Sequence, residues 1–204
     1  MGFNHKAATW DSIERIQRAQ KIADAIAKAI PLKKNYLALE FGCGTGLVSF
    51  NLIDQLMHIT LTDTSEGMIK VLRHKIKAHH VTNMDAVLGD IMKHPGLISP
   101  KLDLIYSSMV LHHIGDTQST LTNLYQLLND QGYLCIIDLV EEDGSFHKSE
   151  PDFQGHNGFN QHKLCQTLTD LGFHDVSSHV FYQDVKQVGS ETIDYSLFIM
   201  VGRK

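Results

Sequence analysis

Three glycines, Gly42, Gly44 and Gly46, follow an acidic residue, Glu40, at the end of a short apolar stretch. Glycine lets a backbone turn tightly and approach a ligand without a Cβ in the way, and the N–H groups at the start of a following helix face the same ligand. The dinucleotide fingerprint G-x-G-x-x-G would need a small residue at position 47, where the chain has Leu47. The loop is therefore typical of a nucleotide-type cofactor site in which the third glycine comes one residue early. A plain glycine-rich turn between a strand and a helix is the alternative.

A second acid, Asp63, stands at the carboxyl end of the brief strand expected over 59–62, about 20 residues after the first glycine. A carboxylate in this place can accept hydrogen bonds from both hydroxyls of a ribose. This spacing favours a ribose-bearing cofactor without choosing between cofactors. An ordinary acid at the start of a helix is the alternative.

The combined pattern E-x-G-x-G-x-G resembles the class I methyltransferases that depend on S-adenosylmethionine (SAM). The resemblance implies that the loop wraps the methionine part of SAM and that Glu40 lies beneath the loop and orders it. It also implies an adenine site, in which Asp90 binds the exocyclic amine, Ile91 packs on the ring and Met68 touches it. A free turn acid at 90 and a core methionine at 68 are the alternatives. The expected cofactor-binding residues are Glu40, Gly42, Cys43, Gly44, Gly46, Asp63, Met68, Asp90, Ile91 and Ser107, with S-adenosylhomocysteine (SAH) as the product.

The elements that must position these residues alternate along the chain. Asp11 is expected to cap a helix over 11–30, with Glu14 three places on and Ile13, Ile16, Ala19, Ala23, Ile26 and Ile30 on its apolar face. Further helices are expected over 47–56, 65–79, 116–128 and 160–171, and strands over 37–40, 59–62, 102–107 and 132–139, with 87–91 as the third strand and its exit. Strands 176–188 and 195–203 are joined by a short link, so they should pair antiparallel. The fold class expected is α/β, a Rossmann-like doubly wound sheet of seven strands, mostly parallel with an antiparallel C-terminal strand; this is also the class I methyltransferase layout.

Composition and charge limit the possible functions. The chain has 204 residues and a net charge of -5 with histidine neutral, and its three cysteines form no C-x-x-C pair. We expect one domain over 1–204, with 1–30 as an N-terminal lid and helix and 141–158 as a substrate loop. Because no Lys/Arg run forms a basic stripe, neither nucleic acid nor a membrane is expected as a partner. Without a recognisable signal peptide the protein should be cytoplasmic; the oligomeric state stays open.

Histidines on the expected substrate edge are the candidates for a general base. His113, His147 and His156 lie there, and imidazole has an unperturbed pKa near neutrality. Each of them is also open to a purely structural, hydrogen-bonding role. His147 and His156 share their loop with Glu150 and Asp152, but this irregular spacing supports a metal site only weakly, and none is predicted.

The residues that follow the expected fourth strand limit the class of substrate. Amino-group methyltransferases acting on DNA bases or glutamine typically carry [N/D]-P-P-aromatic here, whereas residues 107–110 read Ser-Ser-Met-Val. The chain therefore resembles small-molecule methyltransferases, in the group that includes quinone-biosynthesis enzymes. The function expected is transfer of a methyl group from SAM to a small-molecule acceptor by in-line displacement dominated by positioning. A protein that binds SAM or SAH without turnover, as a sensor or partner subunit, is the alternative, and an NAD-type oxidoreductase is disfavoured by Leu47.

Overall fold

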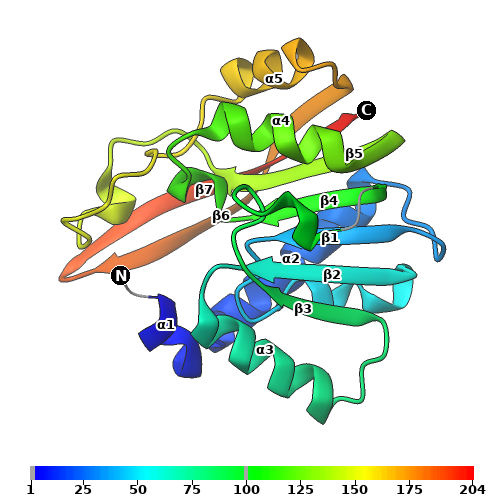
Figure 1. The fold of residues 1–204 in the computed structure, drawn as a ribbon. Coiled ribbons are helices and arrows are strands. Elements are labelled where there is room, and N and C mark those ends of the chain that lie inside the picture. Colours follow the sequence, from blue (N-terminus) through cyan, green and yellow to red (C-terminus); the bar gives the residue numbers. More distant parts are fainter. Residues whose placement is uncertain (1–2, 99–100) are drawn as a thin grey trace.

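A computed structural model describes residues 3–98 and 101–204. Within them the strands form one seven-stranded sheet in the order β3-β2-β1-β4-β5-β7-β6, in which β7 runs antiparallel to both of its neighbours (Figure 1). The Rossmann-like α/β fold expected from the sequence is confirmed. The strands are β1 (Leu37–Phe41), β2 (His58–Asp63), β3 (Met84–Leu88), β4 (Leu102–Ser108), β5 (Leu128–Leu139), β6 (His174–Val188) and β7 (Glu191–Arg203).

Helices cover both faces of the sheet and enclose two apolar cores. α2 (Ile13–Ala29) and α3 (Glu66–Ala78) contribute to the core on one face, and α4 (Thr117–Leu127) and α5 (Gln161–Asp170) to the core on the other. The short α1 (Phe3–Lys6) lies beside the start of α3 (Figure 1). Because both faces are covered, most side chains of the central strands β1 and β4 are buried, on both faces of the sheet.

The start of α2 differs from the expectation. Ser12, and not Asp11, is the N-cap, and its hydroxyl accepts a hydrogen bond from the backbone N–H of Arg15. Ile13 and Ile16 are 70% and 46% exposed, so they are not part of the buried face, which consists of Ala19, Ile22, Ala23 and Ile26. Asp11 is not available as a cap because its carboxylate is bound elsewhere, as described below.

The helix expected over 47–56 is absent, and this prediction was wrong. Two short 3₁₀ segments, Ser49–Asn51 and Ile53–Gln55, take its place. This stretch is rich in serine, asparagine, aspartate and β-branched residues, which have low helix propensity. In addition, the Ser49 hydroxyl bonds to two side chains of the sheet, Glu40 and Tyr106. The glycine loop is therefore followed by a tight turn rather than by the N-terminus of an α-helix.

The third strand begins earlier than expected, at Met84, and ends at Leu88, so that residues 89–91 form its exit. Asp90 then falls in the turn after the strand, where its carboxylate accepts a hydrogen bond from the N–H of Met92. The other caps agree with the sequence: Ser65, Asp116 and Asn160 each accept a hydrogen bond at the start of the helix that follows. Among the described residues, no helix combines the length and apolar composition that crossing a membrane requires.

Candidate active site

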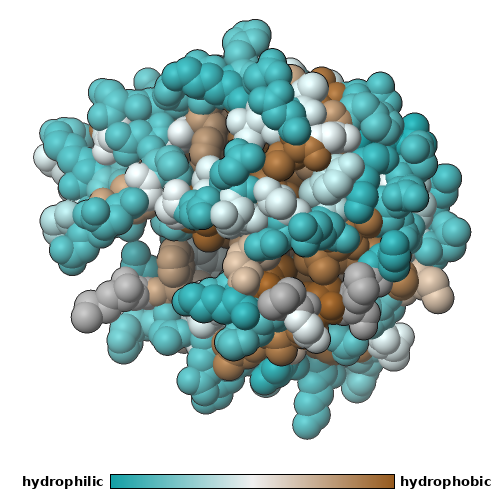
Figure 2. All heavy atoms as spheres, turned by 45° about the horizontal axis from the view of Figure 1, so that its top comes forward, coloured by the Kyte–Doolittle hydropathy of each residue, from teal (hydrophilic) through white to brown (hydrophobic). Residues whose placement is uncertain are grey.

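A cavity of about 580 Å³ opens at the carboxyl ends of β1, β2 and β4, within the size range of small-molecule sites. This is the edge at which open α/β sheets bind their ligands. On the face drawn in Figure 2, hydrophobic side chains gather toward the middle, whereas the rim is hydrophilic. The expected cofactor residues that line the cavity are Glu40, Gly42, Cys43, Gly44, Asp63, Met68 and Asp90.

Glu40 lies at the floor of this cavity, 3% exposed. Its carboxylate accepts a hydrogen bond from Ser49, whose hydroxyl is 2.5 Å from the hydroxyl of Tyr106. Burial raises the pKa of Glu40 to about 8, although the Ser49 hydrogen bond acts in the opposite direction. The side chain is therefore protonated at neutral pH as long as no cation faces it.

Backbone geometry explains why glycine stands at 42. Gly42 has φ +73°, and a Cβ placed there would lie 2.4 Å from a side-chain methyl of Val110. The N–H groups of Gly42 and Cys43 both donate to the carbonyl of Thr62, at 2.9 Å each, which ties the loop to β2. Gly46 also has a positive φ, but a Cβ there would meet Leu72 in the core, and it does not line the cavity.

The thiol of Cys43 is part of the cavity wall but is poorly suited to act as a nucleophile. Burial, together with the nearby Glu40 and Asp63, raises the pKa of the Cys43 thiol well above its usual range. The thiolate that nucleophilic chemistry requires is therefore disfavoured. A small side chain that leaves room for a ligand is the role that the geometry supports.

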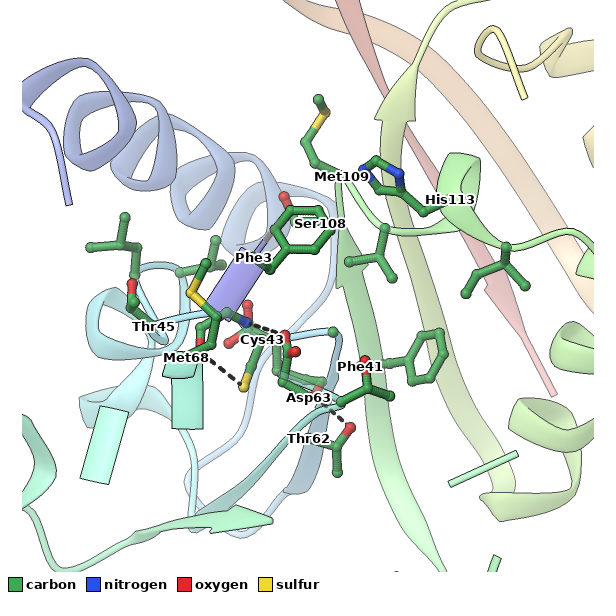
Figure 3. Close-up of a pocket in the computed structure, with 18 of the residues that line it drawn as sticks. Phe3, Phe41, Cys43, Thr45, Thr62, Asp63, Met68, Ser108, Met109 and His113 are labelled. Atoms are coloured by element: carbon green, nitrogen blue, oxygen red, sulfur yellow. Dashed lines mark hydrogen bonds between the residues drawn. The ribbon is translucent and has the colours of Figure 1, made fainter. Parts of the chain in front are cut away.

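Asp63 holds the loop with the same carboxylate that faces the cavity. Oδ2 accepts a hydrogen bond from the N–H of Gly44 and Oδ1 accepts one from the N–H of Ser65, both at 2.8 Å. A carboxylate has about four acceptor sites, so capacity remains on both oxygens for the hydroxyls of a ligand. Figure 3 shows Asp63 next to Cys43 of the glycine loop, below Phe3 in this view.

The N-terminal segment is fastened across this site by two sets of contacts. Asp11 forms an ion pair with Lys75 at 2.8 Å and accepts a hydrogen bond from the hydroxyl of Thr45 at 2.5 Å, which joins the segment to the glycine loop. The side-chain oxygen of Asn4 accepts hydrogen bonds from the Ser65 hydroxyl and from the N–H of Gly67, at the start of α3. These long-range partners are the reason why Asp11 does not cap α2.

Two aromatic side chains of this segment, Phe3 and Trp10, line the cavity, with ring centroids 5.7 Å apart. Phe3 also lies against His113, at 5.5 Å between ring centroids, so that Phe3 and the loop after β4 meet over the pocket (Figure 3). Arg15 stacks on Trp10, 4.1 Å from the ring centroid, and fixes its orientation. The cavity is therefore partly roofed by the N-terminal segment; residues 1 and 2 of the expected lid lie outside the described residues.

Besides Gly46, two of the expected cofactor residues lie outside the lining. Ile91 is 2% exposed in the core, and its neighbour Met92 lines the cavity instead. Ser107 is buried, with its hydroxyl donating to the carbonyl of Phe41, and the cavity is lined by Ser108. In both cases the side chain that lines the cavity is one position further along the chain. For Ser107 and Ser108 the reason is that successive side chains of a strand point to opposite faces of the sheet.

The loop after β4 carries two adjacent histidines, of which one reaches the far end of the cavity. Met109 takes the left-handed conformation (φ +58°), uncommon for a residue with a side chain, and turns the chain sharply. His113 lines the cavity, and burial together with its histidine neighbours lowers the pKa of His113 to about 4, so its ring is neutral at neutral pH. His112 turns the other way and lies 1% exposed, with Nδ1 2.5 Å from the carboxylate of Asp138 on β5.

The long loop after β5 supplies the remaining candidates. The His147 ring lies 5.4 Å from that of His113 and stacks on Phe153 at 3.7 Å. His156 donates its backbone N–H to the carbonyl of His112 at 2.7 Å, and its Nε2 lies 2.9 Å from the carbonyl of Ile114. Neither His147 nor His156 lines the cavity, so of the three expected base candidates only His113 does.

Sequence reasoning had not singled out His112 and Asp138 as a pair. One signal was present, because Asp138 interrupts the apolar strand Ile136-Ile137-Asp138-Leu139, where a charge needs a buried partner. The partner itself depends on β4 and β5 being neighbours, with Ser108 opposite Ile137.

Comparison with known proteins identifies the family. A family model described as a methyltransferase domain matches residues 32–192, so the chain belongs to the methyltransferase-domain family. It is a class I domain of the kind that uses SAM as cofactor, which confirms the resemblance carried by residues 40–46.

Individual relatives agree with this assignment. An uncharacterized methyltransferase of Schizosaccharomyces pombe is 31% identical over 124 residues, which are 56% of this chain and 43% of that protein. The malonyl-[acyl-carrier protein] O-methyltransferase of Serratia marcescens is 27% identical over 138 residues, 68% of this chain and 51% of that protein. The chain thus spans about half the length of these curated relatives. A crystal structure of a SAM-dependent methyltransferase from Aquifex aeolicus has the same fold, with a TM-score of 0.69 at 18% identity, and the match covers 98% of this chain and 97% of that one.

Proposed function

We propose that this protein transfers the methyl group of SAM to a small-molecule acceptor and releases SAH. One observation carries the proposal: a single cavity extends from the glycine loop and Asp63 to His113 and Met109. A cofactor at the first end and an acceptor at the second would share one enclosed space. Methyl transfer from a sulfonium is an in-line displacement, so holding the two reactants aligned supplies most of the catalysis.

The cofactor end is assigned by the groups that each part of SAM needs. Glu40 and the loop Gly42–Gly46 would hold the methionine part, and the carboxylate of Asp63 would accept hydrogen bonds from both ribose hydroxyls. Met68 and Asp90 would face the adenine, the first by packing and the second by hydrogen bonding. Met92 and Ser108 line the cavity where Ile91 and Ser107 were expected to, and we assign the contacts to them.

The acceptor end has an apolar wall and one imidazole. Phe3, Trp10, Met109 and Ile114 line it, and His113 adds a neutral ring that can accept a hydrogen bond from an acceptor hydroxyl, amine or thiol. An apolar ring of the kind that quinone-biosynthesis enzymes methylate suits such a wall. We assign residues 1–30 as the N-terminal lid and helix and 141–158 as the acceptor-holding loop of a single domain over 1–204.

A carboxylate is a second acceptor chemistry to include. Arg15 and Arg18 both line the cavity, and a guanidinium binds a carboxylate well. The name of the Serratia marcescens relative describes O-methylation of a malonyl group on a carrier protein. The SAM carboxylate competes for the same arginines, so the acceptor screen has to contain acids as well as phenols, thiols and amines.

The test is incubation with methyl-labelled SAM and this panel, followed by the mass of each product. A labelled product together with SAH supports the proposal. Tight SAM binding with no product from any class would favour the alternative, a SAM- or SAH-binding protein without turnover. Replacing His113, His147 or His156 is expected to lower turnover more than SAM affinity, because His113 lines the acceptor end, His147 lies beside His113 and His156 bonds to the carbonyl of Ile114. The reverse result would move the acceptor site elsewhere.

A further inference from the structure

Three imidazole rings from two separate loops meet at the acceptor end of the cavity. His112 and His113 come from the turn after β4, and His147 comes from the loop after β5. The ring centroids are 4.1 Å apart for His112 and His113, 5.2 Å for His112 and His147, and 5.4 Å for His113 and His147. One ring nitrogen from each lies within 4.8 Å of those of the other two. We propose that these three histidines form a binding site for a divalent transition-metal ion of the Zn²⁺ class.

The first support is the way in which His112 is held. Its Nδ1 lies 2.5 Å from Asp138, which is itself completely buried, and the second oxygen of Asp138 accepts a hydrogen bond from the His112 backbone N–H. A metal-binding histidine almost always uses its other ring nitrogen in this way, which fixes the tautomer and strengthens the ligand. The pair with Asp138 thus leaves Nε2 of His112 as the coordinating nitrogen.

The second support is His147, whose ring has unmet hydrogen-bonding capacity. The residue is 6% exposed, and neither of its ring nitrogens has a hydrogen-bond partner among the described residues. A buried polar atom without a partner is rare, because it has lost its hydrogen bonds to water without gaining others. The Glu150 carboxylate approaches Nδ1 only to 3.5 Å, while Phe153 stacks on the ring at an angle of 9° and sets its plane. A metal ion would satisfy one nitrogen and would let Glu150 close on the other.

The dimensions suit a site that contracts when it is loaded. Three nitrogens around a tetrahedral zinc are about 3.3 Å apart, because Zn–N bonds are about 2.0–2.1 Å long. From separations of up to 4.8 Å, the rings have to approach one another by roughly 1–1.5 Å, which rotation of the side chains can supply. Three protein ligands leave a fourth position open, as in catalytic zinc sites.

The open position would face the cavity, since His113 is part of its lining (Figure 3). There the metal would bind the acceptor as an oxygen or sulfur anion, and this step rests on the proposed methyl transfer. The acceptor hydroxyl or thiol releases its proton to water on binding. Its oxygen or sulfur then forms a bond to the methyl carbon, while the C–S bond of SAM breaks and leaves its electron pair on the sulfur of SAH. The metal thus selects acceptors that ionise, phenols and thiols before alkyl amines.

The test measures metal binding in the absence of any cofactor or acceptor. The purified protein, stripped with a chelator, is titrated with Zn²⁺ against a chromophoric chelator and with Co²⁺, whose visible absorption reports the ligand geometry. We expect one equivalent to bind. His147→Phe, which keeps a ring against Phe153, and His113→Gln should each lose at least about 100-fold in affinity, and Asp138→Asn about 10- to 100-fold.

The matched control is His174→Ala, which removes an exposed histidine that also lies beside an aspartate, 3.1 Å from Asp175. This variant should bind Zn²⁺ as the parent does. Near-ultraviolet circular dichroism shows which variants remain folded, and His113→Gln, at the partly exposed position, serves if His147→Phe does not fold. The inference is overturned if the parent binds no stoichiometric Zn²⁺ or Co²⁺, or if folded His113→Gln binds as tightly as His174→Ala.

The two proposals fail separately. Methyl transfer by the metal-free protein, with no metal bound by the parent, would remove this site and leave the proposed function standing. A bound metal with the expected variant pattern, but no methylated product from any acceptor, would remove the proposed function and leave the site.

Discussion

Glu40→Gln tests the electrostatics of the cavity floor. Glutamine has nearly the shape of a protonated glutamate and can still accept the hydrogen bond from Ser49. Since burial raises the pKa of Glu40 to about 8, the folded protein keeps this carboxyl protonated over a pH range in which the unfolded chain, with the usual value of 4.5, ionises it. The substitution removes that difference and leaves every other titrating group in place.

The sign and size follow from proton linkage. Below about pH 4.5 the Glu40 carboxyl is protonated in both the folded and the unfolded protein, so it does not change the free energy of unfolding. As the pH rises from there toward about 8, Glu40 ionises only in the unfolded chain, which lowers the free energy of the unfolded state and makes the parent protein less stable. Between the two pKa values, the unfolding free energy falls by about 1.4 kcal/mol per pH unit, and the decrease becomes smaller as the pH approaches the pKa of the folded state. Between about pH 6 and about pH 8, the parent should therefore lose about 2 kcal/mol of unfolding free energy relative to Glu40→Gln.

Urea denaturation of both proteins at several pH values measures this difference directly, since the other ionisable groups are common to both. A difference that does not change with pH would refute the reasoning, because Glu40 would then be ionised in the folded protein. A second measurement tests whether SAM binding changes the protonation of Glu40. SAM carries a sulfonium and an ammonium, so its binding should ionise Glu40 and release up to one proton at neutral pH, seen by calorimetry in buffers of different ionisation enthalpy; Glu40→Gln should abolish that release.

Three further substitutions test other parts of the site. Asp63→Ala should weaken SAM binding by about 1.5–3 kcal/mol, or about 10- to 150-fold, with the fold intact; unchanged affinity would rule out the ribose contact. Gly42→Ala should lower the unfolding free energy by about 2–4 kcal/mol, because alanine is strained in the left-handed conformation and its Cβ would overlap a neighbouring side chain. The control Gly189→Ala, at a positive φ but in open space, should lower it by only about 1–2 kcal/mol. Equal losses would contradict the close packing behind the loop. Gly67→Ala places a Cβ 2.7 Å from the backbone of the N-terminal segment and should speed SAM dissociation about tenfold without lowering the stability of the protein. The control Gly115→Ala, with nothing within 4 Å of its Cβ, should change neither the dissociation rate nor the stability. Equal dissociation rates for the two variants would exclude a lid formed by the N-terminal segment.

The fold was largely predictable because its signals are local. Apolar runs mark the strands, and Ser65, Asp116 and Asn160 stand where helices begin. The prediction of secondary structure failed where hydrogen bonds to residues distant in the sequence determine the local conformation. Ser49 bonds to Glu40 and Tyr106 in a stretch expected to be helical, and nothing in residues 47–56 shows those partners.

The candidate site shows the same division. The glycine loop and Asp63 could be found because spacing along the chain defines them. In contrast, His112 and His113 are adjacent in sequence, yet one bonds to Asp138 and the other lines the cavity. That choice depends on the pairing of β4 with β5, and the position of His147 beside them depends on the course of an irregular loop. Neither follows from the order of residues.

The most direct test of the account is a crystal structure of the protein with SAH bound. We expect the homocysteine part against residues 40–46 and both ribose hydroxyls within hydrogen-bonding distance of the Asp63 carboxylate. SAH bound away from the glycine loop, or with its ribose out of reach of Asp63, would contradict the assignment on which the proposed function depends.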